Sequence, residues 1–305
     1  MVRLDNYRGR LRTSVPLSRL TTWKTGGPAD WLAEPSSLEQ LCALMKDLTV
    51  HHLPWFVLGY GSNVLFSDAG FRGVVIVLGD GFEDIRFVDT EIHAGARASL
   101  RALAAEAAAQ SLSGLEPLAG IPGTVGGAAR MNAGAHGVAI LDFCREAQAV
   151  NAGGEIVNLT DIRPGYRSGG FPGDVIITEI LLTLKPGQPD QIRQRMNQYL
   201  EQRRSAQPLS DASAGCTFKN PTGNGAGRLI DRLGLKGFQN GRAAVSEKHA
   251  NFIINSGGAT ASEIIELISY VRSRVLSAYG VRLELEVQIV DEMGCPLDPG
   301  GLPDE

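Results

Sequence analysis

Residues 120–137 read GIPGTVGGAARMNAGAHG and interrupt every helical or strand periodicity in the chain. Six of these 18 residues are glycine, whereas Ile121, Val125 and Met131 are apolar and can pack against a core. A segment of this length without secondary structure is usually functional, and glycine lets a backbone approach a ligand closely. We therefore expect residues 120–137 to form a loop that lies against a flat ring or a diphosphate.

The turn GYGSN at residues 59–63 follows a short apolar strand. Backbone N–H groups at the end of a strand, joined by the Ser62 hydroxyl and the Asn63 amide, can hold a diphosphate. A tight turn capped by its own asparagine also explains these residues. This turn is not the dinucleotide fingerprint G-x-G-x-x-G, because Val64 stands where the third glycine belongs. The later pair Gly223-x-Gly225 fails in the same way, with Arg228 at that position.

Composition and motif spacing exclude several classes of protein. With 29 Lys and Arg against 33 Asp and Glu, the net charge of −4 gives no basic surplus for binding nucleic acid. The four cysteines form no Cys-x-x-Cys pair, which argues against zinc and redox motifs and fits a reducing cytoplasm. The five histidines have no metal-ligand spacing, and neither a Walker A lysine nor a G-x-S-x-G elbow occurs. No apolar run approaches about 18 residues and the N-terminus lacks an apolar core, so we expect no membrane span and no secretory signal.

The remaining periodicity predicts mixed helices and strands. Ser37 and Ser99 are expected to cap helices at 38–48 and 100–110, and Thr260-x-x-Glu263 to cap a long helix ended by Gly280. Further elements are expected as strands at 55–58, 73–78, 85–88, 91–94, 146–150, 156–159 and 175–184, a polar helix at 190–205, one alternating strand at 281–290 (VRLELEVQIV), and a flexible Pro- and Gly-rich tail at 291–305.

Eight motifs in the same order resemble the UDP-N-acetylenolpyruvoylglucosamine reductase (MurB) family of flavoenzymes. They extend over about residues 20–290, which makes the resemblance far more specific than any one motif. Only about 50 residues separate Arg167 from Cys216, and this brevity resembles the shorter, type II subclass. The motifs are TWKTGGPA at 22–29, GYGSN at 59–63, residues 121–137, GYRS at 165–168, GCTFKNP at 215–221, LKG at 235–237, HANF at 249–252 and LELEV at 283–287.

The resemblance implies an α+β fold with two FAD-binding subdomains of the vanillyl-alcohol-oxidase (PCMH) type, expected at 1–80 and 81–188. A substrate-binding domain is expected at 189–290. The resemblance also implies FAD held non-covalently, NADPH as hydride donor, and UDP-N-acetylglucosamine enolpyruvate as acceptor in peptidoglycan precursor synthesis. Tyr166 is an implied substrate contact. The implied FAD contacts are Gly59, Gly61, Ser62, Asn63, Pro122, Gly123, Thr124, Gly126, Gly127, Asn132 and Gly134.

Arg167, Cys216 and Glu286 match the family's catalytic positions. Hydride attack on the β-carbon of an enolpyruvyl ether leaves negative charge on the α-carbon and its carboxylate, so the site needs a cation and an acid. Arg167 supplies a fixed bidentate charge. A glutamate helps there only when it carries a proton, which apolar burial favours. Glu284, two residues from Glu286 on the same face of the expected strand, competes for that role.

Cys216 departs from the family, which usually has serine as proton donor at this position. A thiol pKa of about 8.5 lies far below that of an alkyl hydroxyl, so a thiol delivers a proton more readily, although it is a weaker hydrogen-bond donor. We expect Cys216 to be the acid, with an inert buried cysteine as the alternative. By resemblance Asn220 contacts substrate and Lys219 can neutralise its diphosphate, while Arg228, His249 and Asn251 are weaker candidates.

Two other functions fit parts of the sequence. A flavin-dependent alcohol or sugar oxidase of the same superfamily would react with oxygen and could link its flavin to His136. A non-enzymatic nucleotide-binding protein would keep the glycine segments and lose the chemistry. The motif around Cys216, together with Arg167 and Glu286, argues against both.

Overall fold

The computed structural model describes residues 4–298 and divides into two compact units. Each unit is built from three separate stretches of chain. The boundaries expected from the sequence at residues 80 and 188 stay a prediction. Unit 1 comprises Met1–Arg12, Leu32–Gly59 and Val75–Arg203, and unit 2 comprises Thr13–Trp31, Tyr60–Val74 and Arg204–Glu305.

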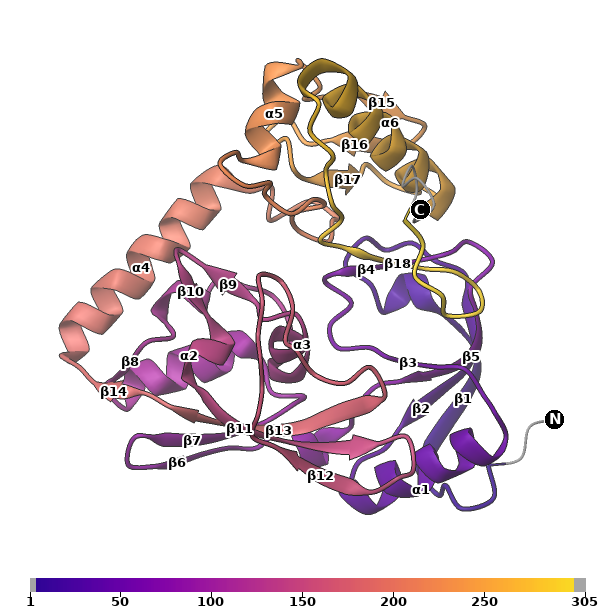
Figure 1. Ribbon diagram of the computed structural model, residues 1–305, viewed down its shortest axis with the longest axis vertical. Helices are drawn as coiled ribbons and strands as arrows, with labels where there is room; N and C mark the ends of the chain where they lie inside the picture. The colour runs from indigo at the N-terminus through magenta and orange to yellow at the C-terminus, as the bar shows by residue number, and fades with distance from the viewer. Residues whose placement is uncertain (1–3, 299–305) are drawn as a thin grey trace. The chain divides into compact units, whose positions relative to one another are not determined.

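Unit 1 contains a five-stranded antiparallel sheet in the order β12-β11-β13-β7-β6 (Figure 1). Its central strand β13, Val175–Thr183, is rich in β-branched residues and largely buried, as its sequence predicted. Helix α3, Val125–Arg130, packs on β13 and β7, and helix α1, Leu38–Val50, packs on β11. The other strands are β6 (Ile85–Val88), β7 (Glu91–Gly95), β11 (Cys144–Asn151) and β12 (Ile156–Leu159).

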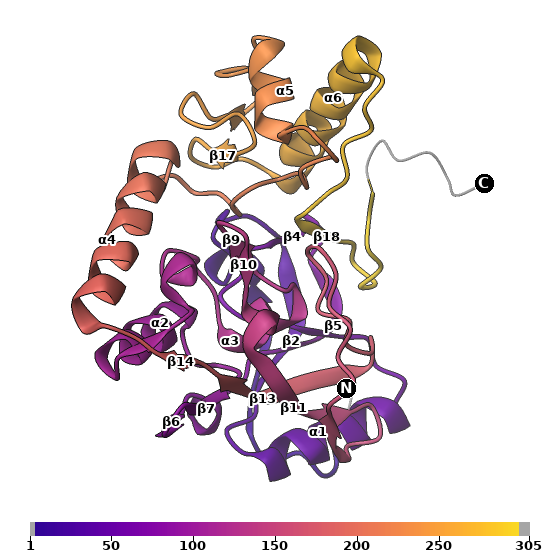
Figure 2. The ribbon, with the colours of Figure 1, turned by 60° about the vertical axis from the view of Figure 1, so that its left-hand side comes forward.

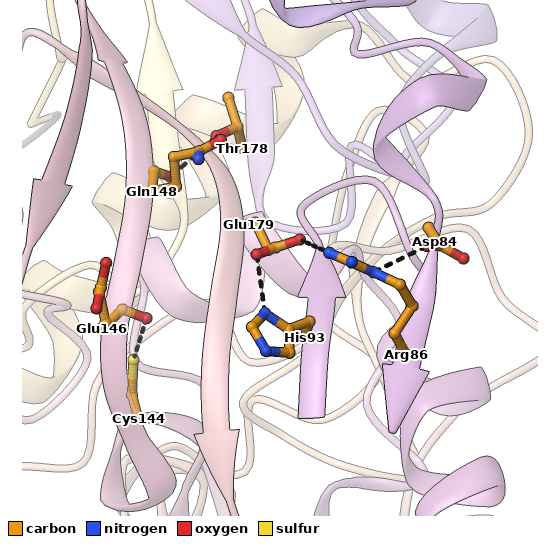
Figure 3. A network of polar contacts seen from close by, with 8 residues as sticks. All are labelled: Asp84, Arg86, His93, Cys144, Glu146, Gln148, Thr178 and Glu179. Atoms are coloured by element: carbon orange, nitrogen blue, oxygen red, sulfur yellow. Dashed lines mark hydrogen bonds and ion pairs between the residues drawn. The ribbon is translucent and has the colours of Figure 1, made fainter. Parts of the chain in front are cut away.

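A polar network links three strands of this sheet (Figure 3). Glu179 of β13 contacts Arg86 Nη2 of β6 at 3.0 Å and His93 Nδ1 of β7 at 3.2 Å. Arg86 Nε also pairs with Asp84 at 3.1 Å. Such cross-strand pairs stabilise the register in which the strands lie, and these side chains remain partly exposed to water.

The polar helix expected at 190–205 is confirmed as α4, Pro189–Ala206. Its Arg195 Nη2 lies 2.7 Å from an oxygen of the buried Glu116 carboxylate, which also accepts the N–H of Gly114 at 2.6 Å. Burial by itself raises the pKa of Glu116, but the Arg195 guanidinium and the backbone donors bring it below its ordinary value. The two groups are therefore a charged pair that fastens α4 to the short 3-10 helix Glu116–Leu118.

Unit 2 contains a three-stranded antiparallel sheet in the order β15-β16-β17. Helix α6, Ala261–Tyr279, packs on this sheet, and helix α5, Ala226–Arg232, lies beside α6 (Figure 2). The predicted capping box at Thr260 and Glu263 is present, and Gly280 ends α6 in the left-handed conformation at φ 64°. The strands are β15 (Gln239–Asn240), β16 (Ala243–Val245) and β17 (Ile253–Asn255).

Trp23, from the motif at 22–29, anchors the core of unit 2. Its side chain is fully buried, and its indole N–H donates to the Ile253 carbonyl at 2.8 Å. The Asn255 amide donates to the Trp23 carbonyl, also at 2.8 Å. The Trp23 side chain packs in the cluster that contains Leu65 and Phe218, so this motif has a structural role.

Two expectations from periodicity are wrong. Residues 120–137 are not free of secondary structure, because Thr124 caps the short helix α3. The alternating segment 281–290 is a strand only at β18, Gln288–Val290, which pairs in parallel with β4, Val64–Phe66. Its alternation instead reflects burial, since Leu283, Val287 and Ile289 are buried along an otherwise irregular stretch.

The expected flexible tail begins with ordered contacts: Asp291 Oδ1 accepts the N–H groups of Met293 and Cys295 at 2.9 and 2.7 Å. Residues 299–305, the rest of that tail, lie outside the described residues.

Among residues 4–298, no helix combines the length and apolar character that a membrane crossing requires. The remaining elements are α2 (Leu100–Ala109), a four-stranded sheet in the order β1-β2-β5-β3 (Arg10–Pro16, Pro28–Glu34, Phe71–Ile76, Trp55–Val57), and the pairs β8 with β14 (Leu112–Ser113, Lys185–Pro186) and β9 with β10 (Gly134–Ala135, Val138–Ala139).

Candidate active site

The glycine-rich segment predicted to contact FAD forms the start of α3 in unit 1. Thr124 Oγ1 accepts the N–H of Gly127 at 3.2 Å, and the N–H of Gly126 donates to the Ala96 carbonyl at 2.8 Å. A Cβ on Gly126 would lie only 2.8 Å from the Ala96 Cβ. Glycine therefore lets α3 approach its neighbour closely, which fixes where the segment around Thr124 lies.

Asn132, another predicted FAD contact, is buried one residue beyond the C-cap of α3. Its Nδ2 donates to the Gly165 carbonyl at 3.0 Å, and its Oδ1 accepts the N–H of Leu141 at 3.3 Å. Both ends of the carboxamide thus bind the protein itself. A contact between Asn132 and FAD stays a prediction, whereas its hold on Gly165 is structural.

Tyr166 and Arg167 form the tip of a tight hairpin in unit 1. Gly165 and Ser168 exchange backbone hydrogen bonds of 2.8 and 3.2 Å on either side of them. Arg167 has φ 58°, in the left-handed region that disfavours residues other than glycine. Its guanidinium carbon lies 5.0 Å from the centre of the exposed Tyr166 ring. A strained arginine beside an exposed ring is an arrangement that can receive a planar carboxylate.

A short antiparallel ladder in unit 2 brings the Cys216 segment beside Glu286. The Thr217 carbonyl accepts the N–H of Glu286 at 2.9 Å, and the N–H of Lys219 donates to the Glu284 carbonyl at 2.9 Å. Cys216 is a half-buried cysteine next to this ladder and forms no disulfide among the described residues. The structure thus brings two predicted catalytic residues, 70 positions apart in the chain, onto adjacent backbone segments.

Asn251 holds this ladder from the other side. Its Oδ1 accepts the N–H of Phe218 at 3.0 Å, and its Nδ2 donates to the Phe218 carbonyl at 2.8 Å. The Asn251 carbonyl accepts the N–H of Thr217, also at 2.8 Å. The HANF motif therefore contributes a buried amide that fixes the backbone following Cys216, a role that the sequence did not reveal.

Glu284 and Glu286 differ in their surroundings. The Glu284 carboxylate is 73% exposed and pairs with Lys219 Nζ at 3.3 Å. Glu286 is half-buried, and its carbonyl accepts the Asn63 amide at 3.0 Å. Glu284 is therefore a surface partner of Lys219, the lysine predicted to contact a diphosphate. The backbone of Glu286, in contrast, is hydrogen-bonded to both Thr217 and Asn63.

The turn at residues 59–63 has the features that a diphosphate requires. Gly61 has φ 62°, and a Cβ there would lie 2.1 Å from the Leu20 carbonyl oxygen, so only glycine fits. Within residues 4–298, no hydrogen bond uses the N–H groups of Gly59, Tyr60 or Gly61. Unbonded N–H groups in a glycine turn suit the oxygens of a diphosphate, so the residues present fit this part of FAD.

Two polar side chains near Cys216, those of Asn220 and Thr217, have features that the sequence did not predict. Asn220 Oδ1 accepts the N–H of Ala226 at 3.0 Å and so caps α5, a structural role beside its predicted substrate contact. The Thr217 hydroxyl is buried and has no hydrogen-bond partner among the described residues. Across residues 4–298, no group of three or more His, Cys, Asp or Glu side chains is arranged to hold a metal ion.

The fold and the glycine segments define the chain as an FAD-binding flavoprotein: residues 29–160 match the family model described as "FAD binding domain". Residues 207–290, which carry Cys216 and Glu286, match the model described as "UDP-N-acetylenolpyruvoylglucosamine reductase, C-terminal domain". The chain belongs to the UDP-N-acetylenolpyruvoylglucosamine reductase (MurB) family. The expected α+β fold of FAD-binding and C-terminal domains is confirmed.

Relatives and a solved structure agree with this assignment over nearly the whole chain. The UDP-N-acetylenolpyruvoylglucosamine reductase of Heliobacterium modesticaldum is 41% identical over 303 residues, 98% of this chain and 96% of that protein. The enzyme of the same name from Anoxybacillus flavithermus is 42% identical over 92% of this chain and 95% of its own. The crystal structure of the Thermus caldophilus reductase (MurB) is similar with a TM-score of 0.79 and 37% identity, covering 92% of this chain and 98% of that one.

Proposed function

We propose that this chain reduces UDP-N-acetylglucosamine enolpyruvate to UDP-N-acetylmuramate with NADPH and FAD. The reaction belongs to peptidoglycan precursor synthesis, and so to cell-wall biogenesis, cell shape and cell division. Family membership supports the reaction, and the observation that carries it is the ladder that brings Cys216 and Thr217 beside Glu286. Because the proposed substrates are a nucleotide sugar and NADPH, we also propose a cytoplasmic location.

FAD, when bound, supplies the hydride that reaches the β-carbon of the enolpyruvyl ether. We assign its diphosphate to the N–H groups of residues 59–61, joined by Ser62 and Asn63, and its other contacts to the residues around Gly123 and Thr124. Gly123 has φ 153°, and Gly126 allows α3 to pack closely, so these glycines preserve the shape of the segment. Their backbone, and not a side-chain charge, is what we expect to hold FAD.

Arg167 and Tyr166 are assigned to the enolpyruvyl group. The Arg167 guanidinium can bind the carboxylate in two parallel hydrogen bonds and stabilise the negative charge that develops there. Tyr166 lies against this guanidinium and restricts its orientation. A charge that is already oriented stabilises the transition state without the cost of ordering a flexible side chain.

Cys216 is assigned as the acid that donates the Sγ proton to the α-carbon. Glu286 is assigned as a carboxyl group that hydrogen-bonds the developing enolate through its own proton. Lys219 and Asn220 are assigned to the remainder of the nucleotide sugar. Lys219 would exchange its exposed partner Glu284 for a diphosphate oxygen.

An anaerobic absorption titration tests the reaction itself. We expect NADPH to bleach the flavin band of the purified protein, and UDP-N-acetylglucosamine enolpyruvate to restore it. Bleaching without recovery would reject this substrate. Acid precipitation should release the flavin, whereas a flavin that stays attached and is rapidly reoxidised by air would favour the oxidase alternative with His136.

Substitution of Cys216 tests the proton donor. Cys216→Ala should leave flavin reduction by NADPH intact and slow reoxidation by the sugar about 100-fold or more, the usual scale for general acid catalysis. Cys216→Ser should retain substantial turnover, because a hydroxyl can donate the same proton. Cys295→Ser, at an exposed free cysteine, is the control and should match the unsubstituted protein. Unchanged reoxidation in Cys216→Ala would show that another group is the acid.

A further inference from the structure

Arg130, the last residue of α3, binds a row of backbone carbonyls and has no part in the proposed chemistry. Its Nη1 donates to the carbonyls of Phe171 and Pro172 at 3.3 and 2.6 Å. Its Nη2 donates to those of Gly173 and Val175 at 3.4 and 3.0 Å. One guanidinium thus fastens the segment 171–175, which directly follows the hairpin that carries Arg167.

The same end of α3 holds the hairpin by two more contacts. The N–H of Gly169 donates to the Arg130 carbonyl at 2.9 Å, and a Cβ on Gly169 would lie 2.3 Å from the Ala129 carbonyl oxygen. On the other side of the tip, Asn132 donates to the Gly165 carbonyl at 3.0 Å. Both legs of the hairpin are therefore attached to one short stretch, residues 129–132, at the C-terminal end of α3.

These contacts matter because the conformation of Arg167 is unfavourable by itself. A non-glycine residue with φ 58° persists only when its surroundings enforce it. A rigid fork of donors can bind several carbonyls at once, which a lysine ammonium on a flexible stem does not reproduce. The burial that accompanies these contacts lowers the pKa of Arg130 from its ordinary value, yet arginine stays charged at any working pH.

We propose that Arg130 is a positioning residue for Arg167: by binding the carbonyls of residues 171–175 it fixes the hairpin whose tip presents the Arg167 guanidinium. The inference rests on the proposed function for what Arg167 does, but not for how the hairpin is held. It makes α3 a shared support, since Thr124 at its start belongs to the segment assigned to FAD and Arg130 at its end holds the Arg167 hairpin.

The first test is the rate at which UDP-N-acetylglucosamine enolpyruvate reoxidises the reduced flavin. Displacing a catalytic group by about 1 Å costs about 100-fold, so Arg130→Met should lower the limiting rate about 10- to 100-fold. Arg130→Lys, which keeps the charge, should recover little of it. Arg163→Met removes an exposed arginine two residues before the hairpin, where it pairs with Asp161 at 2.8 Å, and should reoxidise normally. A normal limiting rate in Arg130→Met would overturn the proposal.

A double variant separates positioning from general damage. If Arg130 acts through Arg167, Arg130→Met should slow the Arg167→Met protein no further, because the positioned group is already absent. Slowing by the full factor seen in the single variant would overturn the proposal. Melting temperature and bound flavin, measured for every variant, identify any variant that has not folded, and Arg130→Lys then carries the comparison.

Hydrogen exchange tests the anchor without any substrate. Amides of residues 165–170 should exchange at least about 10-fold faster in Arg130→Met than in Arg163→Met, because a lost anchor lets the hairpin open locally. Equal exchange in the two variants would overturn the proposal. If the unsubstituted protein is not reoxidised by the sugar, the proposed function fails, while this measurement still decides whether Arg130 fixes the hairpin.

Discussion

At the scale of single residues, Arg167 has a backbone that glycine would adopt more easily. We predict that Arg167→Gly has a free energy of unfolding about 1 kcal/mol higher than Arg167→Ala, since alanine keeps the left-handed strain at φ 58° and glycine does not. Both variants should lose fast reoxidation, because both lack the guanidinium. Urea denaturation of the two proteins gives the difference directly. Equal stability would mean that the hairpin relaxes when Arg167 is replaced.

Thr217 is a second residue at which a substitution should change stability. Its buried hydroxyl has no partner among the described residues, so Thr217→Val should raise the free energy of unfolding of the flavin-free protein by about 1 kcal/mol. Thr178→Val is the control, because the equally buried Thr178 hydroxyl donates to the Gln148 carbonyl at 3.1 Å and its loss should destabilise by about 1 kcal/mol. A destabilising Thr217→Val would reveal a partner for the hydroxyl.

At the scale of elements, the packing of α3 depends on one glycine more than on its neighbour. Gly126→Ala places a Cβ 2.8 Å from that of Ala96 and should lower the free energy of unfolding by about 1–3 kcal/mol. Gly127→Ala is the comparison, because Gly127 is exposed, its nearest neighbour is Thr124 Oγ1 at 3.2 Å, and alanine favours a helix. Thermal melting should separate the two variants clearly, and equal melting would show that α3 shifts to accept the methyl group.

The same helix shows why some elements can be predicted from sequence and others cannot. Helix α6 can be predicted from its capping box and its apolar stripe, both of which are local signals. Helix α3 has only Thr124 as a cap, and two glycines in its first turn lower its helix propensity. Its stability comes from packing on β13 and β7, which no local pattern contains. Residues 281–290 fail in the opposite sense: their alternation is real but follows burial, because only Gln288–Val290 forms a regular strand, while Leu285 makes a single bridge with Phe218.

At the scale of the whole molecule, residue types that do chemistry were easier to find than residues that hold them. Arg167, Cys216 and Glu286 stand out through the motifs around them. Asn251 and Arg130 also lie in quoted motifs, but their anchoring roles were not predicted, because each binds backbone groups that are remote in sequence. Carbonyls carry no sequence signal, so such anchors become visible only once the chain is folded.

Stability of the whole chain should also depend on pH through His249. Its ring is half-buried, and its Nδ1 accepts the N–H of Asn251 at 3.2 Å. Burial, with a smaller contribution from the Lys236 charge, lowers the pKa of His249 below its ordinary value near 6.5. The unfolded chain then takes up a proton first as the pH falls, so this stability is present above pH 6.5 and is lost as the pH drops below it.

We therefore expect the difference in unfolding free energy between the unsubstituted protein and His249→Gln to shrink as the pH is lowered from about 7.5 to about 5.5. Taking the difference removes the titration of groups that both proteins share. Because Asn251 clamps the backbone after Cys216, protonation of His249 within the folded protein would disturb that clamp first. Protection of the Thr217 and Phe218 amides from hydrogen exchange should then weaken over the same pH interval, and a pH-independent difference would remove His249 from this role.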